Sequence, residues 1–225
     1  MTAFRDHKVK YLTREQVAAT ALAWWKLAER RGHTFNICKF VTDVLVKRLG
    51  GKGPLKIKFY EYNERHELPE RACVTFNPTL TLHIWRSIWD GANTGVPHDR
   101  FIVAHEIGHI VLHDQYAAAF SNDDEAKLNF LQKEESAEEQ ANAFADLFLA
   151  PDHVALSFRD VDTIALLCVV SDEMATRRLR DALIERNPII RIYDGEICCK
   201  CYNSTLISNG RQITCDTCGN VTTRI

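Results

Sequence analysis

The sequence has no long hydrophobic run and little net charge. Its longest apolar stretch, Ile164 to Val170, is far shorter than the ~20 residues that cross a bilayer. The first ten residues are charged and lack the apolar segment of a secretory signal, so we expect no membrane contact. A formal net charge of -2 gives the whole chain no electrostatic preference for nucleic acid. The length, 225 residues, predicts one full domain with room for a smaller one.

The sequence also lacks a disulfide pattern, although it contains eight cysteines. Cys38, Cys73 and Cys168 are scattered among apolar neighbours, whereas the other five lie between Cys198 and Cys218. The spacing within that cluster is typical of metal ligands rather than of disulfides. We therefore expect a reduced, cytoplasmic protein.

What the sequence does contain is the segment FIVAHEIGHIVLHD, from Phe101 to Asp114. His105 and His109 are four residues apart, which on a helix places both imidazoles on one face, about 6 Å apart along the axis. Two such imidazoles can bind one Zn²⁺. Glu106 lies about 100° further round the helix, where it can take a proton from water at the open position of the metal. This pattern favours a metallopeptidase over an amphipathic core helix.

A catalytic zinc site normally has three protein ligands. The extended HExxHxxGxxH motif is absent, because Leu112 stands at its glycine position and Gln115 at its third histidine. A glutamate from a following helix is the remaining standard solution. We favour Glu138, which opens a helix rich in small residues, over Glu135 and Glu139.

Three further residues are candidates for supporting or regulating the site. Asn142 follows Glu138 by one helical turn and is expected to orient a ligand. His113 lies one turn beyond His109 and is expected to support the site or the fold rather than to bind the same metal. Cys73, in a predicted strand, is a candidate inhibitory ligand for the open position of the zinc. The alternative for Cys73 is a small buried core residue.

The remaining patterns predict an α+β order of elements. Thr13 is expected to cap a helix that runs to about Arg31, and a second helix is expected from Asn36 to Gly50. Short strands are predicted at residues 56–61, 72–76 and 80–85, and a polar loop at residues 90–100. Helices, then a small sheet, then the site helix make an α+β fold.

A helical pair is predicted from Ile164 to Leu183, with Ser171 capping its second helix. That helix carries Arg177, Arg178 and Arg180. A DNA-reading helix-turn-helix is one interpretation, but three arginines are a weak electrostatic footprint. We favour a helical pair that packs on the peptidase.

The C-terminal region contains two Cys-x-x-Cys pairs, Cys198 with Cys201 and Cys215 with Cys218. The Asn209-Gly210 dipeptide between them favours a hairpin turn that would bring both pairs around one tetrahedral Zn²⁺. So short a module cannot bury enough apolar surface to fold alone, so this zinc would be structural. The pattern predicts a zinc ribbon.

Three segments, FIVAHEIGHIVLH, EEQANAFADLFLAP and VVSDEMATRRL, make the chain resemble the ImmA/IrrE family of metallo-endopeptidases from about Thr13 to Leu183. The resemblance implies the following roles: catalytic zinc ligands His105, His109 and Glu138, with Glu106 as general base. Two departures are Ala150, where the family usually has methionine, and the tail beyond Asn187, which is outside the shared core.

The resemblance also implies a function. Family members cut a helix-turn-helix (Xre-like) repressor, so we expect a regulatory zinc endopeptidase that derepresses a stress, mobile-element or antiphage-defence operon. Single-stranded DNA, or another nucleic acid, is a candidate activator acting through the ribbon. The alternative is a non-catalytic zinc protein that binds a repressor or nucleic acid.

The predicted organisation has three parts. Residues 1–154 form a gluzincin-like α+β metallopeptidase domain, in which a helix that carries a glutamate completes the HExxH site. Residues 155–188 form a helical, helix-turn-helix-like extension, and residues 189–225 form the zinc ribbon.

Overall fold

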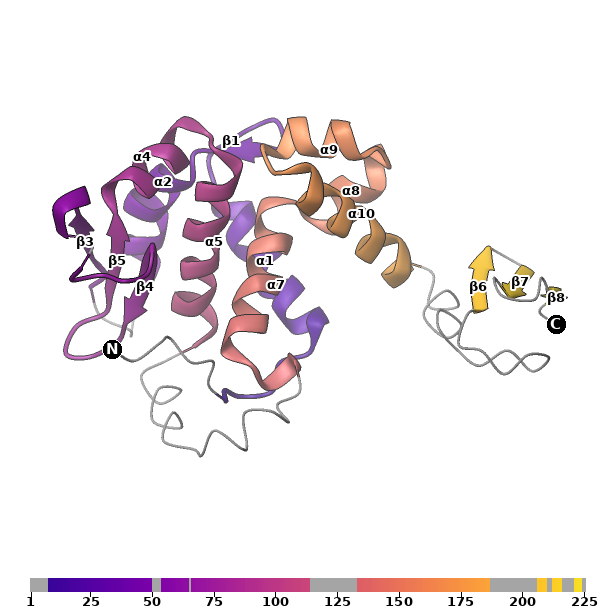
Figure 1. The fold of residues 1–225 in the computed structure, drawn as a ribbon, viewed down its shortest axis with the longest axis horizontal. Helices are drawn as coiled ribbons and strands as arrows, with labels where there is room; N and C mark the ends of the chain where they lie inside the picture. Colours follow the sequence, from indigo (N-terminus) through magenta and orange to yellow (C-terminus); the bar gives the residue numbers. More distant parts are fainter. Residues whose placement is uncertain are drawn as a thin grey trace.

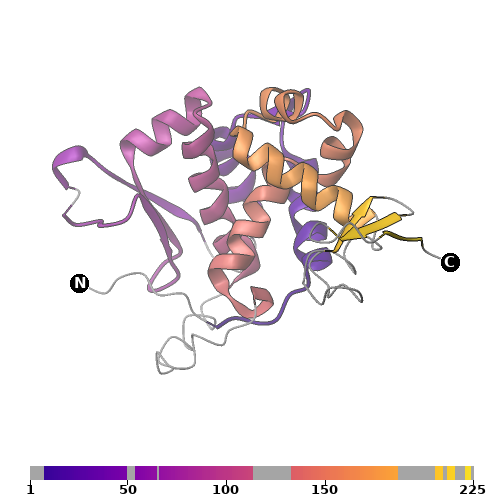
Figure 2. The same ribbon diagram turned by 45° about the vertical axis from the view of Figure 1, so that its right-hand side comes forward.

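The computed structural model describes residues 8–49, 54–64, 66–113, 133–186, 206–209, 212–215 and 221–223. Figure 1 shows a small sheet beside a group of helices, and Figure 2 shows the same elements after a turn. Among the described residues, none of the helices has both the length and the apolar composition needed to cross a bilayer.

The helices and strands of the described residues are grouped as in an α+β fold, with β3 to β5 between two groups of helices. The α-helices are α1 (Arg14–Leu27), α2 (Ile37–Phe40), α3 (Val46–Arg48), α4 (Arg86–Thr94), α5 (Pro97–Leu112), α7 (Ala137–Leu149), α8 (Asp152–Phe158), α9 (Val161–Cys168) and α10 (Asp172–Arg186). The strands are β1 (Arg30–Arg31), β2 (Thr34–Phe35), β3 (Lys56–Tyr60), β4 (Ala72–Thr75), β5 (Thr81–Trp85), β6 (Leu206–Asn209), β7 (Gln212–Cys215) and β8 (Val221–Thr223).

The three strands predicted before the site helix form one sheet in the order β3-β5-β4. Strand β3 runs parallel to β5, whereas β4 pairs with β5 in the antiparallel direction and forms an edge of the sheet. Leu82 and Ile84 of β5 are fully buried, which fixes the face of the sheet that joins the core. The α+β prediction is confirmed.

The first helix begins as predicted but ends earlier. Thr13 and Gln16 form a capping box. The backbone N of Gln16 donates to Thr13 Oγ1, and the backbone N of Thr13 donates to Gln16 Oε1. The predicted end near Arg31 is wrong, because the chain becomes extended at Ala28 and then pairs as β1 with β2. Gly32, with φ of 67°, supplies the left-handed conformation in this hairpin turn.

The second helix begins at Asn36 as predicted, with Asn36 as its N-cap, but it is not a continuous α-helix. Residues 41–45 form a π-helical segment, η1 (Val41–Leu45), between α2 and α3. Nothing in the apolar spacing distinguishes this insertion from an ordinary helical turn.

The predicted polar loop at residues 90–100 is also wrong. These residues complete α4 and form the first turn of α5, separated by a left-handed residue at Gly95 (φ 94°). The reason is that Ile88 and Ala92 are four residues apart and both buried, so one apolar face suffices to form a helix despite the polar composition. Pro97 then starts α5, where a missing N–H costs nothing.

Helices α8, α9 and α10 lie together on the side of the helical group away from the sheet (Figures 1 and 2). Ser171 Oγ accepts a hydrogen bond from Met174 N, so the predicted cap of the second helix is confirmed. Arg178 is 1% exposed; its Nε donates to Ala150 O and its guanidinium also binds Asp152. Arg178 therefore helps to pack α10 against the segment that joins α7 and α8.

In the C-terminal region, β6 pairs with β7 and β7 with β8, each in the antiparallel direction. The predicted hairpin is confirmed by the pairing of Leu206 with Cys215 and of Asn209 with Gln212. The predicted zinc ligands Cys198, Cys201 and Cys218 lie outside the described residues, and Cys215 is described only as the last residue of β7.

Helices α5 and α7 approach each other closely at Gly108. A Cβ atom added at this position would lie 3.0 Å from Ala141 Cα and 3.1 Å from Ala141 O. Both are backbone atoms of α7, which cannot rotate out of the way. Glycine between the two histidines therefore allows the backbone of α7 to approach α5.

We predict that Gly108→Ala lowers both the stability of the protein and its affinity for zinc. Overpacking costs about 1 to 3 kcal/mol and exceeds the ~1 kcal/mol that alanine gains in a helix. Chemical denaturation and zinc competition titration measure the two effects. Gly95→Ala is the matched control: it places alanine at a positive φ away from α7, so it should lose stability and keep zinc affinity. Unchanged zinc affinity in Gly108→Ala would contradict the packing argument.

Candidate metal centre

Two helices supply the predicted site residues. Helix α5 carries His105, Glu106 and His109, and α7 carries Glu138 and Asn142. The start of α7 is fixed by a cap in which Ser136 Oγ accepts a hydrogen bond from Glu139 N at 3.0 Å. This cap sets the phase of α7 and with it the direction of the Glu138 side chain.

The side chains of His105, His109 and Glu138 meet at one point. Their donor atoms all lie within 4.8 Å of one another. The two Nε2 atoms are 3.0 Å apart, and the Glu138 carboxylate oxygens lie 3.2 Å from His105 Nε2 and 3.3 Å from His109 Nε2. Ligand atoms about 2.0 to 2.1 Å from a tetrahedral zinc are about 3.3 Å apart. The N, N, O donor set therefore fits Zn²⁺.

The other two candidate glutamates lie elsewhere. Glu135 Oε1 is 2.9 Å from Lys8 Nζ, in a bridge that joins the N-terminal segment to the residues before α7. Glu139 is exposed and lines a neighbouring cavity. Of the three glutamates, the structure brings Glu138 to the histidines.

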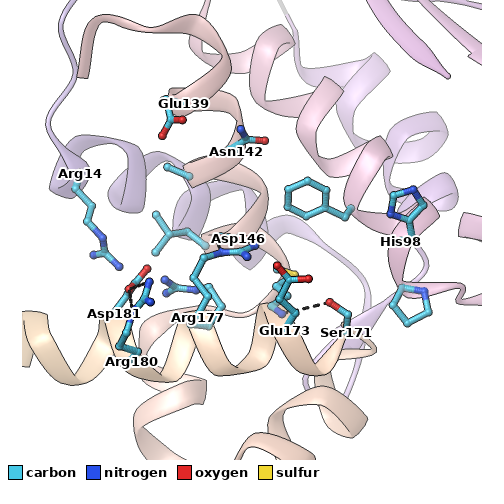
Figure 3. Close-up of a pocket in the computed structure, with 16 residues that line it drawn as sticks. Arg14, His98, Glu139, Asn142, Asp146, Ser171, Glu173, Arg177, Arg180 and Asp181 are labelled. Atoms are coloured by element: carbon cyan, nitrogen blue, oxygen red, sulfur yellow. Dashed lines mark hydrogen bonds and ion pairs between the residues drawn. The ribbon is translucent and has the colours of Figure 1, made fainter. Parts of the chain in front are cut away.

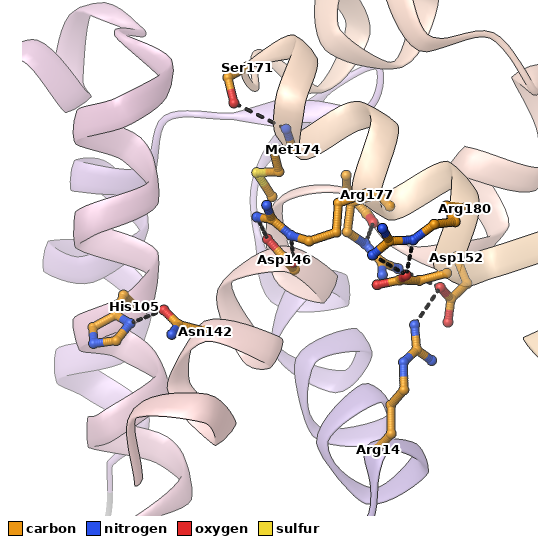
Figure 4. A network of polar contacts seen from close by, with 12 residues as sticks. Arg14, His105, Asn142, Asp146, Asp152, Ser171, Met174, Arg177 and Arg180 are labelled. Atoms are coloured by element: carbon orange, nitrogen blue, oxygen red, sulfur yellow. Dashed lines mark hydrogen bonds and ion pairs between the residues drawn. The ribbon is translucent and has the colours of Figure 1, made fainter. Parts of the chain in front are cut away.

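Asn142 fixes the orientation of the first histidine (Figure 4). Its Oδ1 lies 2.9 Å from His105 Nδ1, so the histidine donates its Nδ1 proton to the amide oxygen. The Nε2 atom of His105 then presents a lone pair to the metal position. Asn142 thus has the orienting position expected from its spacing in the sequence.

A longer chain of hydrogen bonds orients the second histidine. Gln140 Nε2 donates to Lys10 O at 2.8 Å and to Glu134 O at 2.6 Å, which leaves Oε1 to accept from His113 Nε2 at 3.1 Å. His113 Nδ1 is then an acceptor, and His109 Nδ1 donates to it at 3.2 Å. The lone pair of His109 Nε2 therefore points at the metal position.

Gln140 is a site residue that the sequence analysis missed. It is 2% exposed and joins His113 to backbone carbonyls of two other segments. No local spacing links residues 10, 113 and 140, so only the tertiary structure could identify this role.

Glu106 is a buried acid beside the donor set. It is 5% exposed, and its Oε2 has no hydrogen-bond partner among the described residues. Burial is the main cause that raises the pKa of Glu106 to about 8, with the charge of Glu138 adding to the effect and that of His105 opposing it. A carboxylate at such a position can hold and release a proton near neutral pH.

The charges of the ligands depend on one another. Burial alone would lower the pKa of His105, but its hydrogen bond to Glu138 and the charges of Glu106 and Glu138 outweigh burial and raise it. Burial likewise opposes ionisation of Glu138, but hydrogen bonds from His105 and His109 lower its pKa. The Glu138 carboxylate therefore favours the protonated form of His105, and the two histidines favour the ionised form of Glu138.

Cys73 lies in β4, half-buried, and pairs across the sheet with His83. Its Sγ is not one of the three donor atoms that meet within 4.8 Å. Burial raises the pKa of the Cys73 thiol to about 12, which favours the neutral form. A role as an inhibitory ligand stays a prediction.

The candidate site opens into a cavity of about 680 Å³. One wall is formed by the segment that leads into β4 and by Trp85 at the end of β5; the other is formed by α5 and α7. Cavities of this size hold small ligands or short peptide segments. The donor set and Glu106 lie on its lining.

Taken together, an α+β fold, an HExxH helix and a carboxylate from a second helix as the third ligand are the features of a zinc metallopeptidase. Residues 85–180 match the family model Peptidase_M78, described as the IrrE N-terminal-like domain. The match includes every donor atom of the site and Glu106, and it supports a metallopeptidase of the ImmA/IrrE family. No curated protein matched the chain.

We predict that the thermal stability of the metal-free protein and the affinity of the protein for zinc change in opposite directions with pH. The raised pKa values of His105 and Glu106 mean that the folded state keeps protons which the unfolded chain has lost. Thermal stability in chelator should therefore fall from pH 5 to about pH 8. Zinc affinity should rise over the same range, because zinc displaces the His105 proton. Glu106→Gln should flatten the stability profile; an unchanged profile would contradict the burial argument.

We also predict that Gln140→Met weakens zinc binding about 10- to 100-fold, because His113 and then His109 lose their fixed orientation. Zinc competition titration measures the change. Gln16→Met is the control for the loss of a glutamine side-chain hydrogen bond, since Gln16, which is exposed, makes one in the cap of α1, away from the site. Equal zinc affinity in both variants would contradict the orienting role of Gln140.

Proposed function

We propose that this chain is a zinc-dependent, site-specific endopeptidase. The observation that carries the proposal is the buried Oε2 of Glu106, which has no hydrogen-bond partner in the described part of the chain and lies beside three donor atoms at zinc-ligand spacing. A purely structural zinc site has no need of a second acid that does not bind the metal, whereas peptide hydrolysis requires a base there.

The residues of the site have separate tasks in this mechanism. His105, His109 and Glu138 would hold Zn²⁺, which when bound lowers the pKa of water and polarises a carbonyl group. Glu106 Oε2 takes the proton from the attacking water and later delivers it to the nitrogen of the leaving amine. Asn142 and Gln140, through His113, hold both imidazoles with Nε2 toward the metal.

For the substrate we propose a helix-turn-helix (Xre-like) repressor, whose cleavage would derepress a stress, mobile-element or antiphage-defence operon. The support is the match to the IrrE N-terminal-like family model and the three segments that resemble ImmA/IrrE proteins. Single-stranded DNA, or another nucleic acid, is the proposed activating signal.

We propose a second, structural zinc in the C-terminal region. Its ligands would be Cys198, Cys201, Cys215 and Cys218, and its support is the spacing of the two cysteine pairs together with the β6–β7 hairpin between them. Cys215 ends β7, so the hairpin delivers one member of the second pair.

We predict that host cells expressing the wild-type chain contain a cleaved repressor that is absent with Glu106→Gln. Loss of the general base should reduce cleavage by at least ~10²-fold. New protein N-termini, measured before and after DNA damage, identify the substrate and the cut. The wild type and Glu106→Gln should each bind two zinc ions, and Glu138→Ala should lose the catalytic one.

The matched control is Glu135→Gln, which removes a glutamate that pairs with Lys8 outside the donor set. It should keep both zinc ions and the cleavage. If the wild type and Glu106→Gln give the same N-termini while both retain a bound repressor, the endopeptidase proposal is wrong and binding without cleavage replaces it.

A further inference from the structure

A second cavity of about 720 Å³ lies beside the metal cavity, between α7 and α10 (Figure 3). We call it the α7–α10 groove. It shares His98, Phe101 and Asn142 with the lining of the metal cavity. The two hollows therefore adjoin at Asn142, the residue that orients the metal ligand His105.

The floor of the α7–α10 groove is apolar. Leu147 and Met174 are each 4% exposed and belong to the core, whereas Phe101 and Ala143 are half-buried. Binding of a bulky apolar side chain on such a floor is favourable, because it removes apolar surface from water.

Two pairs of opposite charges around the groove are internal to the protein. Arg177 binds Asp146 through two hydrogen bonds of 2.7 and 2.8 Å (Figure 4), and Arg180 lies 3.1 Å from Asp181 (Figure 3). Paired charges offer little net attraction to a charged ligand. The groove therefore suits an apolar side chain flanked by polar backbone.

Helix α7 gives the groove a direction relative to the metal. Glu138, Asn142 and Asp146 recur every four residues and so follow one stripe of the helix. The eight helical steps from Glu138 to Asp146 span about 12 Å at 1.5 Å per residue. An extended peptide covers that distance with about three or four residues, at about 3.3 Å each.

We propose that the α7–α10 groove is a specificity site for the polypeptide substrate. It binds a bulky apolar side chain about three or four residues from the scissile bond, while the bond itself lies at the metal. This inference rests on the proposed endopeptidase function. It makes α10, which belongs to the helical extension, one wall of the substrate site.

The test uses the full-length, zinc-loaded protein, with and without the proposed activator single-stranded DNA, and a proteome-derived peptide library. Ala143→Leu fills the floor of the groove from its half-buried position on α7, and Ala143→Val fills it less. Ala165→Leu is the matched control, because Ala165 is also half-buried but lies on α9, outside the lining of both cavities. Zinc content and thermal stability are measured for each variant.

The wild type should prefer a bulky apolar residue three or four positions from the cut. Ala143→Leu should lower kcat/KM for such peptides about tenfold or more, and Ala143→Val by less, with the zinc content unchanged. Ala143→Leu should cut peptides with a small residue at that position as fast as the wild type does. Ala165→Leu should cut all peptides as fast as the wild type does.

Two other outcomes are distinguishable. If the wild type cuts peptides but the preference is absent, or is the same in Ala143→Leu, the groove is not a specificity site and the endopeptidase proposal stands. If the zinc-loaded wild type cuts no peptide in the library, the endopeptidase proposal fails and the groove inference fails with it.

Discussion

The candidate metal centre depends on the close contact between α5 and α7. Two histidines on one helix supply two ligands from spacing alone, but a third ligand requires another helix at very short distance. Gly108 permits that distance, since any side chain there would meet the Ala141 backbone of α7. Glu138 lies one turn before Ala141, and its carboxylate reaches both imidazoles. The site is therefore a consequence of helix packing as much as of the HExxH pattern.

This packing places several ionisable groups in a poorly hydrated space, which is unfavourable unless their charges are compensated. Glu138 and His105 compensate each other through a hydrogen bond and opposite charge. Within the part of the chain that the structure describes, Glu106 has no such partner at Oε2, and burial raises its pKa to about 8. A divalent cation at the donor set would supply the missing positive charge. The free-energy cost of burying these ionisable groups without a cation therefore favours metal binding. The same burial raises the pKa of Glu106, so that it can act as a base near neutral pH.

Local signals in the sequence predicted the parts of the structure that are local in the chain. The spacing of His105 and His109, the Thr13 cap and the Ser171 cap each depend on residues within one turn of a helix. Glu138 could be predicted to lie near the histidines because a catalytic zinc site normally has a third protein ligand, and because Glu138 opens a helix rich in small residues.

Features that join distant segments could not be predicted in this way. Gln140 acts through contacts with Lys10, Glu134 and His113, and no periodicity records those contacts. The polar residues from 90 to 100 predicted a loop. Residues 90–94 are nevertheless helical, because they belong to α4, whose apolar face buries Ile88 and Ala92. The α7–α10 groove exists only because α10 packs beside α7.

Helix α7 connects the metal centre to the helical extension. Its first turn carries Glu138, whereas its last turns carry Asp146, which binds Arg177, and end at Ala150, whose carbonyl accepts from Arg178. Arg178 is nearly inaccessible to solvent, so α10 cannot leave α7 without exposing a buried cation and freeing its partners. The extension therefore holds the far end of the ligand-bearing helix while also forming a wall of the groove. Any change in how α10 packs would affect the α7–α10 groove and the position of the third ligand together.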